Sequence, residues 1–141
     1  MDCPFCATIA GGRLLVHRSR TTSVILDHAP VFLGHCLVVP NWHVENLLAA
    51  DSGTLLDLAE MERRVARALM DSLGADGALT LTNTIVSQSV MHLHTHVIPR
   101  RRGDGLRGFL WPRQRYRDGA QAEEYRDRIG AALAGYASTT T

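Results

Sequence analysis

The sequence predicts an α+β fold in which a long helix covers an antiparallel β-sheet, and three observations support this. Short segments rich in β-branched residues lie on both sides of an amphipathic stretch over 51–73. In that stretch the apolar residues recur at helical spacing, and Gly74 follows the last turn. A second amphipathic segment begins at Asp118, which predicts another helix near the C-terminus.

The chain opens with Cys3-Pro4-Phe5-Cys6, two cysteines separated by two residues. Such a pair occurs in redox couples, in one half of a zinc knuckle, and by coincidence. The redox interpretation is weakened because no βαβ pattern follows the pair. Structural zinc takes four ligands, of which this pair would supply two.

Strands are predicted over 22–27, 32–39 and 78–84, where β-branched and apolar residues dominate. The first strand ends at Asp27, whose carboxylate either stabilises the following turn or serves a site. The second strand has one exception in an otherwise apolar row, His35. A histidine in that position needs a polar partner, either in a purely structural role or in support of a site.

Asp51 and Ser52 suit the N-terminal cap of a helix that runs to Leu73. Its apolar positions form one stripe, and its arginines lie largely outside the stripe and are expected to face solvent. The last predicted helix carries a stripe of its own, made of Tyr125, Ile129, Leu133 and Tyr136.

His92, His94 and His96 alternate with apolar or β-branched residues in a run that ends at Pro99. Alternate side chains of a strand share one face, so the imidazoles would form a row with Cα atoms about 6.6 Å apart. Burying three imidazoles is unfavourable unless each has a partner, so the row indicates function rather than packing. Two kinds of site fit it: a three-histidine metal site, or a phosphoryl-transfer site with histidine as nucleophile.

Five motifs in order over residues 3 to 100 resemble the histidine triad family of nucleotide hydrolases and transferases, in its zinc-bearing bacterial type. The run above matches the family's His-x-His-x-His signature. The other motifs are Cys3-x-x-Cys6, Asp27 before Pro30, Gly34-His35-Cys36-Leu37-Val38-Val39-Pro40 followed by His43, and Gln88-Ser89-Val90 before His92. The resemblance implies the family's α+β fold, with an antiparallel sheet of about five strands, a covering helix and a C-terminal helix.

The resemblance also implies roles for the matching residues. The middle histidine, His94, would be the nucleophile, and His96, His35 and Ser89 would stabilise charge on the phosphate oxygens. Phe5 and Ile9 would line a purine pocket, although ordinary core positions fit them equally well. The other nucleotide contacts would be Asp27, Asn83, Gln88 and Ser89. A structural zinc ion would be held by Cys3, Cys6, His43 and His92, with no organic cofactor, and two copies would form a homodimer.

The implied reaction is hydrolysis or transfer at the α-phosphorus of a purine nucleotide derivative, through a covalent nucleotidyl-histidine. Dinucleoside polyphosphates and nucleoside phosphoramidates both fit as substrates. Seven of the fifteen basic residues, all arginine, lie between 100 and 117, where they either form a solvated face or bind distal phosphates. Trp111, in the same segment, would stack on a base or pack across a dimer interface. The arginines favour the polyphosphates slightly. The alternative of another class is a catalytically silent nucleotide-binding module, against which the retained histidines and Ser89 argue.

The loop before the triad departs from the family pattern. Relatives usually carry glycines there, often as Asn-Asn-Gly and Gly-Gln, whereas this chain has Asn83-Thr84-Ile85 and Ser87-Gln88. The missing glycines weaken the prediction that backbone N–H groups of this loop bind phosphate.

With 141 residues, of which 45% are hydrophobic, the chain fits one domain over 1–141, with the family core in 1–100 and an arginine-rich extension and C-terminal helix in 101–141. The net charge of +1 argues against binding of nucleic acid polymers. There is no apolar run of membrane-spanning length and no signal-peptide pattern, and one of the three cysteines is unpaired in any disulfide scheme. We therefore expect a cytoplasmic protein with no membrane contact.

Overall fold

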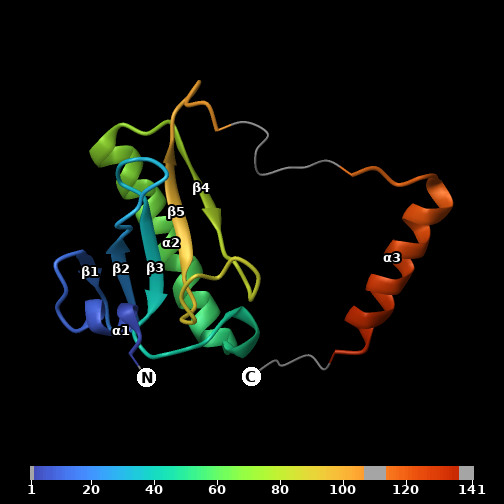
Figure 1. Cartoon of the computed structure of the whole chain (residues 1–141), viewed down its shortest axis with the longest axis horizontal. Helices are drawn as coiled ribbons and strands as arrows, with labels where there is room; N and C mark the ends of the chain where they lie inside the picture. Colours follow the sequence, from blue (N-terminus) through green and yellow to red (C-terminus); the bar gives the residue numbers. More distant parts are fainter. Residues whose placement is uncertain (1, 107–113, 137–141) are drawn as a thin grey trace. The chain divides into compact units, whose positions relative to one another are not determined.

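The computed structural model describes residues 2–106 and 114–136, and its contacts divide the chain into two compact units. The first unit ends at Asp104 and the second begins at Gly105, close to the predicted boundary between core and extension. A single domain spanning the whole chain stays a prediction. The five-stranded sheet belongs to the first unit and the last helix to the second (Figure 1).

In chain order the elements are α1 (Pro4–Ile9), β1 (Leu15–Arg18), β2 (Thr22–Leu26), β3 (Cys36–Pro40), a 3₁₀ helix (Leu47–Ala49), α2 (Ser52–Leu73), β4 (Gly77–Leu81), β5 (Thr95–Arg100) and α3 (Gly119–Ala134). The strands lie in the order β1-β2-β3-β5-β4, and each neighbouring pair is antiparallel. After the β1–β3 meander, α2 leads to the edge strand β4, and β5 then enters between β3 and β4. The predicted α+β fold with an antiparallel sheet, a covering helix and a C-terminal helix is confirmed.

The ends of α2 are those that the sequence predicts. The side chain of Asp51 accepts a hydrogen bond from the N–H of Thr54 at 2.7 Å, and Gly74 ends the helix with a φ of +65°. The buried stripe of α2 that packs on the sheet is made of Leu58, Met61, Val65 and Leu69. Burial of a side chain of this size contributes about 1.5–3 kcal/mol, so the stripe holds α2 against one face of the sheet.

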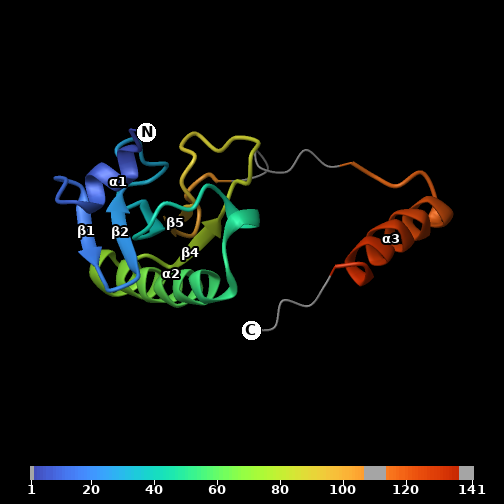
Figure 2. The ribbon, with the colours of Figure 1, turned by 90° about the horizontal axis from the view of Figure 1, so that it is seen from below.

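Helix α1 lies on the opposite face of the sheet from α2 (Figure 2). Ile9 of α1 packs there in a cluster with Leu37 and Val39 of β3. Residues paired directly across antiparallel strands share a face. His96 is paired with Leu37 of β3 and with Leu81 of β4, so its side chain belongs to the α1 face.

The structure corrects the predicted strand 32–39, because β3 begins only at Cys36. Gly34 turns the chain with a φ of +98°, and the N–H of His35 donates back to the carbonyl of Phe32 at 3.0 Å. A Cβ atom at Gly34 would lie 2.5 Å from Cδ1 of Leu73, so both the turn and the close approach of α2 require glycine. The glycine thereby determines where His35 enters the sheet.

The predicted triad strand is also shorter than expected. β5 begins at Thr95, so only His96 of the three histidines lies in a regular strand, and His92 and His94 come just before it. β4 ends earlier than predicted, and β1 forms a sheet edge that the sequence does not predict.

In the second unit, α3 is capped by Asp118, whose side chain accepts a hydrogen bond from the N–H of Gln121 at 2.8 Å. The residues of the predicted apolar stripe are all exposed: Tyr125, Ile129, Leu133 and Tyr136. None of the helices in residues 2–106 and 114–136 combines the length and apolar character that crossing a membrane requires.

Candidate active site and metal-ligand cluster

The three triad histidines divide into a pair and a single ring. The rings of His94 and His96 are neighbours, with centroids 5.1 Å apart. The ring of His92 lies 5.0 Å from the ring of His43. His92 and His94 are almost fully buried, at 0% and 3% exposure, and His96 is half-buried. The members of the predicted row therefore face different partners.

One hydrogen bond fixes which nitrogen of His94 can react. Nδ1 of His94 lies 2.7 Å from the backbone carbonyl oxygen of His92. A carbonyl oxygen only accepts, so Nδ1 carries the proton and Nε2 holds the lone pair. No hydrogen bond within the described residues occupies that Nε2. His94 is thus prepared to attack an electrophile through Nε2.

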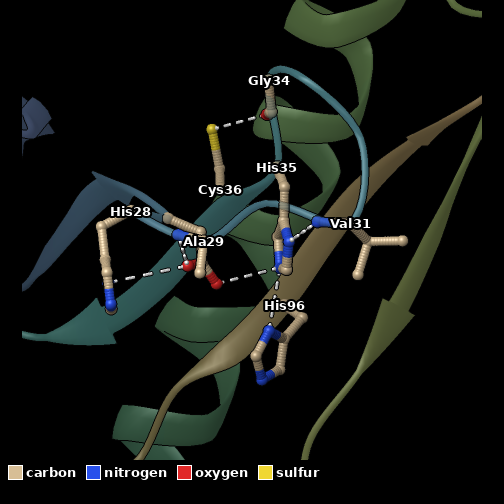
Figure 3. Close-up of polar contacts among 8 residues, drawn as sticks. His28, Ala29, Val31, Gly34, His35, Cys36 and His96 are labelled. Atoms are coloured by element: carbon tan, nitrogen blue, oxygen red, sulfur yellow. Dashed lines mark hydrogen bonds and ion pairs between the residues drawn. The ribbon is translucent and has the colours of Figure 1, made fainter.

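A chain of hydrogen bonds orients His96 (Figure 3). The backbone N–H of Val31 donates to Nδ1 of His35 at 3.1 Å, so the neutral ring of His35 carries its proton on Nε2. This Nε2–H donates to Nδ1 of His96 at 2.9 Å. His96 in turn carries its proton on Nε2. We call Val31, His35 and His96 the donor chain, because Val31 donates a hydrogen bond to His35 and His35 donates one to His96.

Burial keeps both rings of the donor chain neutral. Burial, together with the nearby His94 and His35, lowers the pKa of His96 to about 4. Burial also lowers the pKa of His35, although the charge of Asp27 opposes this shift. Near neutral pH, His96 is therefore an uncharged N–H donor next to His94, suited to stabilising a negatively charged oxygen.

The carboxylate of Asp27, at 13% exposure, has three polar neighbours, of which the exposed His28 is the most distant, with its Nδ1 3.9 Å from Oδ1. Oδ1 accepts a hydrogen bond from the N–H of Ala29 at 2.9 Å and so stabilises the turn, one of the two roles that the sequence predicts. Oδ2 lies 3.5 Å from Nε2 of His35. The charge of Asp27 thus acts on the donor chain, and contact with a ribose stays a prediction.

The possible metal-ligand atoms of Asp27, His35 and His96 lie within 4.8 Å of one another, as in some metal sites. The hydrogen bonds argue against an ion here. Because Nδ1 of His35 accepts from Val31, its Nε2 carries a proton and offers no lone pair.

The four predicted zinc ligands do come together, and we call Cys3, Cys6, His43 and His92 the metal-ligand cluster. Nδ1 of His92 lies 3.4 Å from Sγ of Cys3 and 3.5 Å from Sγ of Cys6. Nδ1 of His43 lies 3.8 Å from Sγ of Cys6. Tetrahedral zinc, with Zn–S near 2.3 Å and Zn–N near 2.0 Å, separates sulfur and nitrogen ligands by about 3.5 Å. The donor atoms therefore fit a bound zinc ion.

His92 links this cluster to His94. Its Nε2 donates to the carbonyl of Pro40 at 3.0 Å, which leaves the lone pair of Nδ1 facing the two sulfur atoms. Its backbone carbonyl meanwhile accepts the Nδ1–H of His94. With His92 turned to the cysteines, the triad rings do not converge, which argues against a three-histidine catalytic metal site.

Phe5 contacts the triad, whereas Ile9 is an ordinary core residue. The Phe5 ring meets the His94 ring edge-on, with centroids 5.0 Å apart and planes at 77°, and it lies 5.9 Å from the ring of His92. Ile9 is 4% exposed within the apolar cluster on the α1 face. Phe5 is placed to border a ligand at His94, and contact of either residue with a base stays a prediction.

The three predicted loop residues have different environments. Asn83 is half-buried and Ser89 is exposed, while Gln88 is buried and its carboxamide is bonded to backbone groups. Positive φ angles occur at Ile85 and Ser87, so the loop adopts glycine-like conformations without glycine.

Two arginines of the predicted phosphate-binding segment have structural partners. Arg100 forms two hydrogen bonds to the carboxylate of Asp104, at 2.6 and 2.9 Å. The guanidinium of Arg101 donates to the carbonyls of Leu73 and Gly74 at the C-terminal end of α2. Arg107, Arg113 and Trp111 lie outside the described residues.

Sequence reasoning missed the groups that fix the ring protons: the N–H of Val31 and the carbonyls of Pro40 and His92. Pro40 and His92 belong to matched motifs, but every residue carries a backbone carbonyl. For Val31, its place between the strand end at Asp27 and His35 is a usable signal, because a turn there brings its N–H near the histidine.

The HIT domain family model matches residues 13–103, more than half of the chain. An uncharacterised HIT-like protein of Mycobacterium tuberculosis is 36% identical over 110 residues, covering 75% of this chain and 76% of that protein. An adenosine 5'-monophosphoramidase of Schizosaccharomyces pombe is 29% identical, covering 79% of this chain and 84% of the enzyme. An adenylylsulfatase of Arabidopsis thaliana is 28% identical, covering 74% of this chain and 55% of the enzyme.

Solved structures agree with these relatives. A Streptococcus mutans protein superposes with a TM-score of 0.82 at 28% identity, covering 94% of this chain and 85% of that one. A zinc-bound histidine triad family protein of Mycobacterium smegmatis superposes with a TM-score of 0.71 at 31% identity, covering 96% of this chain and 99% of that one. The sequence match, the fold and the clustered histidines agree, and this chain belongs to the histidine triad, or HIT, family.

Proposed function

We propose that the chain is a hydrolase or transferase that acts at the α-phosphorus of a purine nucleotide derivative, with His94 as nucleophile. The observation that carries the proposal is the 2.7 Å bond from Nδ1 of His94 to the carbonyl of His92, which leaves Nε2 ready to attack. The nucleotide-binding and hydrolytic character of the family supports it.

The reaction has two displacements. In the first, the lone pair on Nε2 of His94 forms an N–P bond, and the bond from phosphorus to the leaving group breaks with its electron pair. The leaving group then takes up a proton. In the second, water attacks phosphorus and loses a proton, the N–P electrons return to Nε2, and a nucleoside monophosphate leaves. The Nε2–H of His96 would stabilise the phosphate oxygens in both steps.

We favour a nucleoside phosphoramidate or a similar small-leaving-group substrate over a dinucleoside polyphosphate. The arginines of the segment 100–117 favour a polyphosphate, but two of the seven, Arg100 and Arg101, are engaged by Asp104 and the end of α2. The relative from S. pombe is named for phosphoramidate cleavage, and the relative from A. thaliana for cleavage of adenylylsulfate. Diadenosine tri- and tetraphosphate remain the competing substrates.

We also propose that the metal-ligand cluster holds one structural zinc ion. The ligand distances and the zinc-bound relative support this proposal. When bound, zinc would cross-link α1 to the segment that carries His92, and all four of its positions would be taken by protein. Homodimer formation and a cytoplasmic location stay predictions.

The test is turnover of adenosine 5'-phosphoramidate, adenylylsulfate and the two diadenosine polyphosphates by the wild type and by His94→Ala. We expect His94→Ala to abolish turnover and to remove the nucleotidylated histidine that mass spectrometry detects in the quenched wild-type reaction. His17→Ala is the matched control, since His17 is an exposed histidine of β1, and it should keep wild-type turnover. Undiminished turnover by His94→Ala would exclude the mechanism.

A further inference from the structure

The loop between β4 and the triad has a strained backbone. Ile85 has a φ of +70° and Ser87 a φ of +62°, in the left-handed region that residues other than glycine rarely adopt. The N–H of Val86 donates to the carbonyl of Thr84 at 2.9 Å, closing a three-residue turn around Ile85. A turn with this φ is rare, and a β-branched residue at its centre is especially unfavourable. Something else in the structure must hold the turn.

Burial of the loop's own side chains does not hold it. Ile85 and Val86 are 61% and 80% exposed, and Ser87 is exposed as well. The N–H of Gln88 donates to the carbonyl of Ile85 at 3.4 Å, a long bond. The stabilising contacts therefore have to come from a neighbouring buried group.

The carboxamide of Gln88 is such a group. Its Oε1 accepts from the N–H of Ile85 at 3.1 Å, so it holds the centre of the strained turn directly. Its Nε2 donates to the carbonyl of Glu45 at 2.7 Å and to that of Val90 at 3.1 Å. A carboxamide has two N–H donors, and both are used. With 9% of its surface exposed, Gln88 has no donor left for a nucleotide.

Gln88 also connects the loop to the segment that follows β3. Glu45 lies two residues after the metal-ligand residue His43, and the N–H of Leu93 donates to the neighbouring carbonyl of Val44 at 2.6 Å. Both ends of the run from Gln88 to Leu93 are thereby fixed to this segment, and His94 follows directly.

We propose that Gln88 is a positioning residue, which clamps the strained turn at Ile85 and Ser87 in place before the triad and does not itself contact the substrate. That the clamped loop then faces a nucleotide phosphate rests on the function proposed above. The clamping does not depend on it, because it concerns the protein without ligand.

The first test is amide hydrogen exchange in the ligand-free protein, comparing the wild type with Gln88→Ala and with the isosteric Gln88→Glu. Glutamate places an acceptor oxygen against the carbonyls of Glu45 and Val90. We expect exchange at Ile85 and Val86 to rise at least tenfold in both variants, with the amides of α2 unchanged. Gln114→Ala, which removes an exposed glutamine, is the control and should leave the loop unchanged. Loop exchange that stays at the wild-type rate would overturn the proposal.

The second test is rescue, which still decides the matter if Gln88→Glu fails to fold. Glycine adopts positive φ freely, so Ile85→Gly with Ser87→Gly reduces the need for a clamp. We compare the fold-loss of kcat/KM for adenosine 5'-phosphoramidate that Gln88→Ala causes in the two backgrounds. In the double-glycine background this fold-loss should be at least three times smaller than in the wild-type background. A direct contact with substrate predicts the same loss in both backgrounds, and this result would overturn the proposal. If the protein cleaved no nucleotide, the exchange result would still stand, so failures of the two proposals are distinguishable.

Discussion

The metal-ligand cluster and the donor chain each contact His94, through the carbonyl of His92 and the ring of His96, and they have similar side chains but opposite hydrogen-bonding character. The cluster combines two histidines with Cys3 and Cys6, and the two histidines of the donor chain lie beside Asp27. In each of these two sets the possible ligand atoms lie within 4.8 Å of one another. In the cluster, Nε2–H of His92 donates a hydrogen bond to a backbone carbonyl, so Nδ1 has a lone pair for an ion. In the donor chain, Nδ1 of His35 receives a backbone N–H, so Nε2 is a donor. The backbone group on the far nitrogen decides whether an imidazole binds a metal or donates a hydrogen bond.

Loss of the metal-ligand cluster should have the largest effect, and that effect should be on stability. Cys3→Ser together with Cys6→Ser removes both sulfur ligands, and the zinc content should fall from one per chain to nearly none. At free zinc about 1,000 times the dissociation constant, bound zinc adds about 4.1 kcal/mol to the free energy of unfolding, which the variant should lose. Metal analysis with urea unfolding measures both quantities. His17→Ala should retain the zinc and the stability, and an unchanged metal content in the double variant would refute the assignment.

Loss of the donor chain should instead affect the reaction. His35→Leu removes the bond that orients His96, and we expect kcat/KM to fall about 100-fold, or about 3 kcal/mol, with zinc content unchanged. His28→Ala is the control, because His28 lies near Asp27 with an exposed side chain and belongs to neither group. Wild-type turnover by a folded His35→Leu protein would show that His96 needs no such support.

The sequence predicts side chains better than it predicts their backbone partners. The α2 boundaries follow from Asp51 and Gly74, and the four cluster residues follow from motif resemblance. The late start of β3 depends on the fit of Gly34 against Leu73, which exists only after folding. The left-handed Ile85 depends on the buried carboxamide of Gln88 and contradicts local preference. Side-chain type therefore identifies candidate atoms, and only the fold determines which nitrogen of each ring is protonated.

From the donor chain we also expect a pH dependence of stability, whose effect should be smaller than that of His35→Leu. The pKa of His96 is lowered from 6.5 to about 4 by burial, so between these values the unfolded chain binds more protons than the folded one. Stability from this residue is complete above pH 6.5 and is lost as the pH falls through 4. With partial exposure taken into account, we expect about 2 kcal/mol. Urea unfolding of the wild type and of His96→Gln from pH 7 to pH 4 measures it, and parallel pH profiles would contradict the expectation.

The smallest effect is expected from a substitution at Val31, which tests why the two regions differ. Val31→Pro removes the N–H that fixes the proton of His35, while Val31→Ala retains it and is the matched control. Without this N–H, the proton of His35 can move to Nδ1 and Nε2 can accept, so the bond to His96 can reverse and His96 loses its outward donor. We expect kcat/KM to fall about tenfold, or about 1.4 kcal/mol, in the proline variant alone.

The same substitution also allows Nε2 of His35 to carry the lone pair that a metal ion beside Asp27 and His96 requires. At millimolar zinc, the proline variant should therefore bind a second ion that the wild type and Val31→Ala do not, as measured by metal analysis after dialysis. Nitrogen NMR of the ring of His35 would follow the proton directly. If the proton stays on Nε2 in the folded proline variant, the backbone N–H is not what separates the two regions, and Asp27 beside Nε2 becomes the group that holds it there.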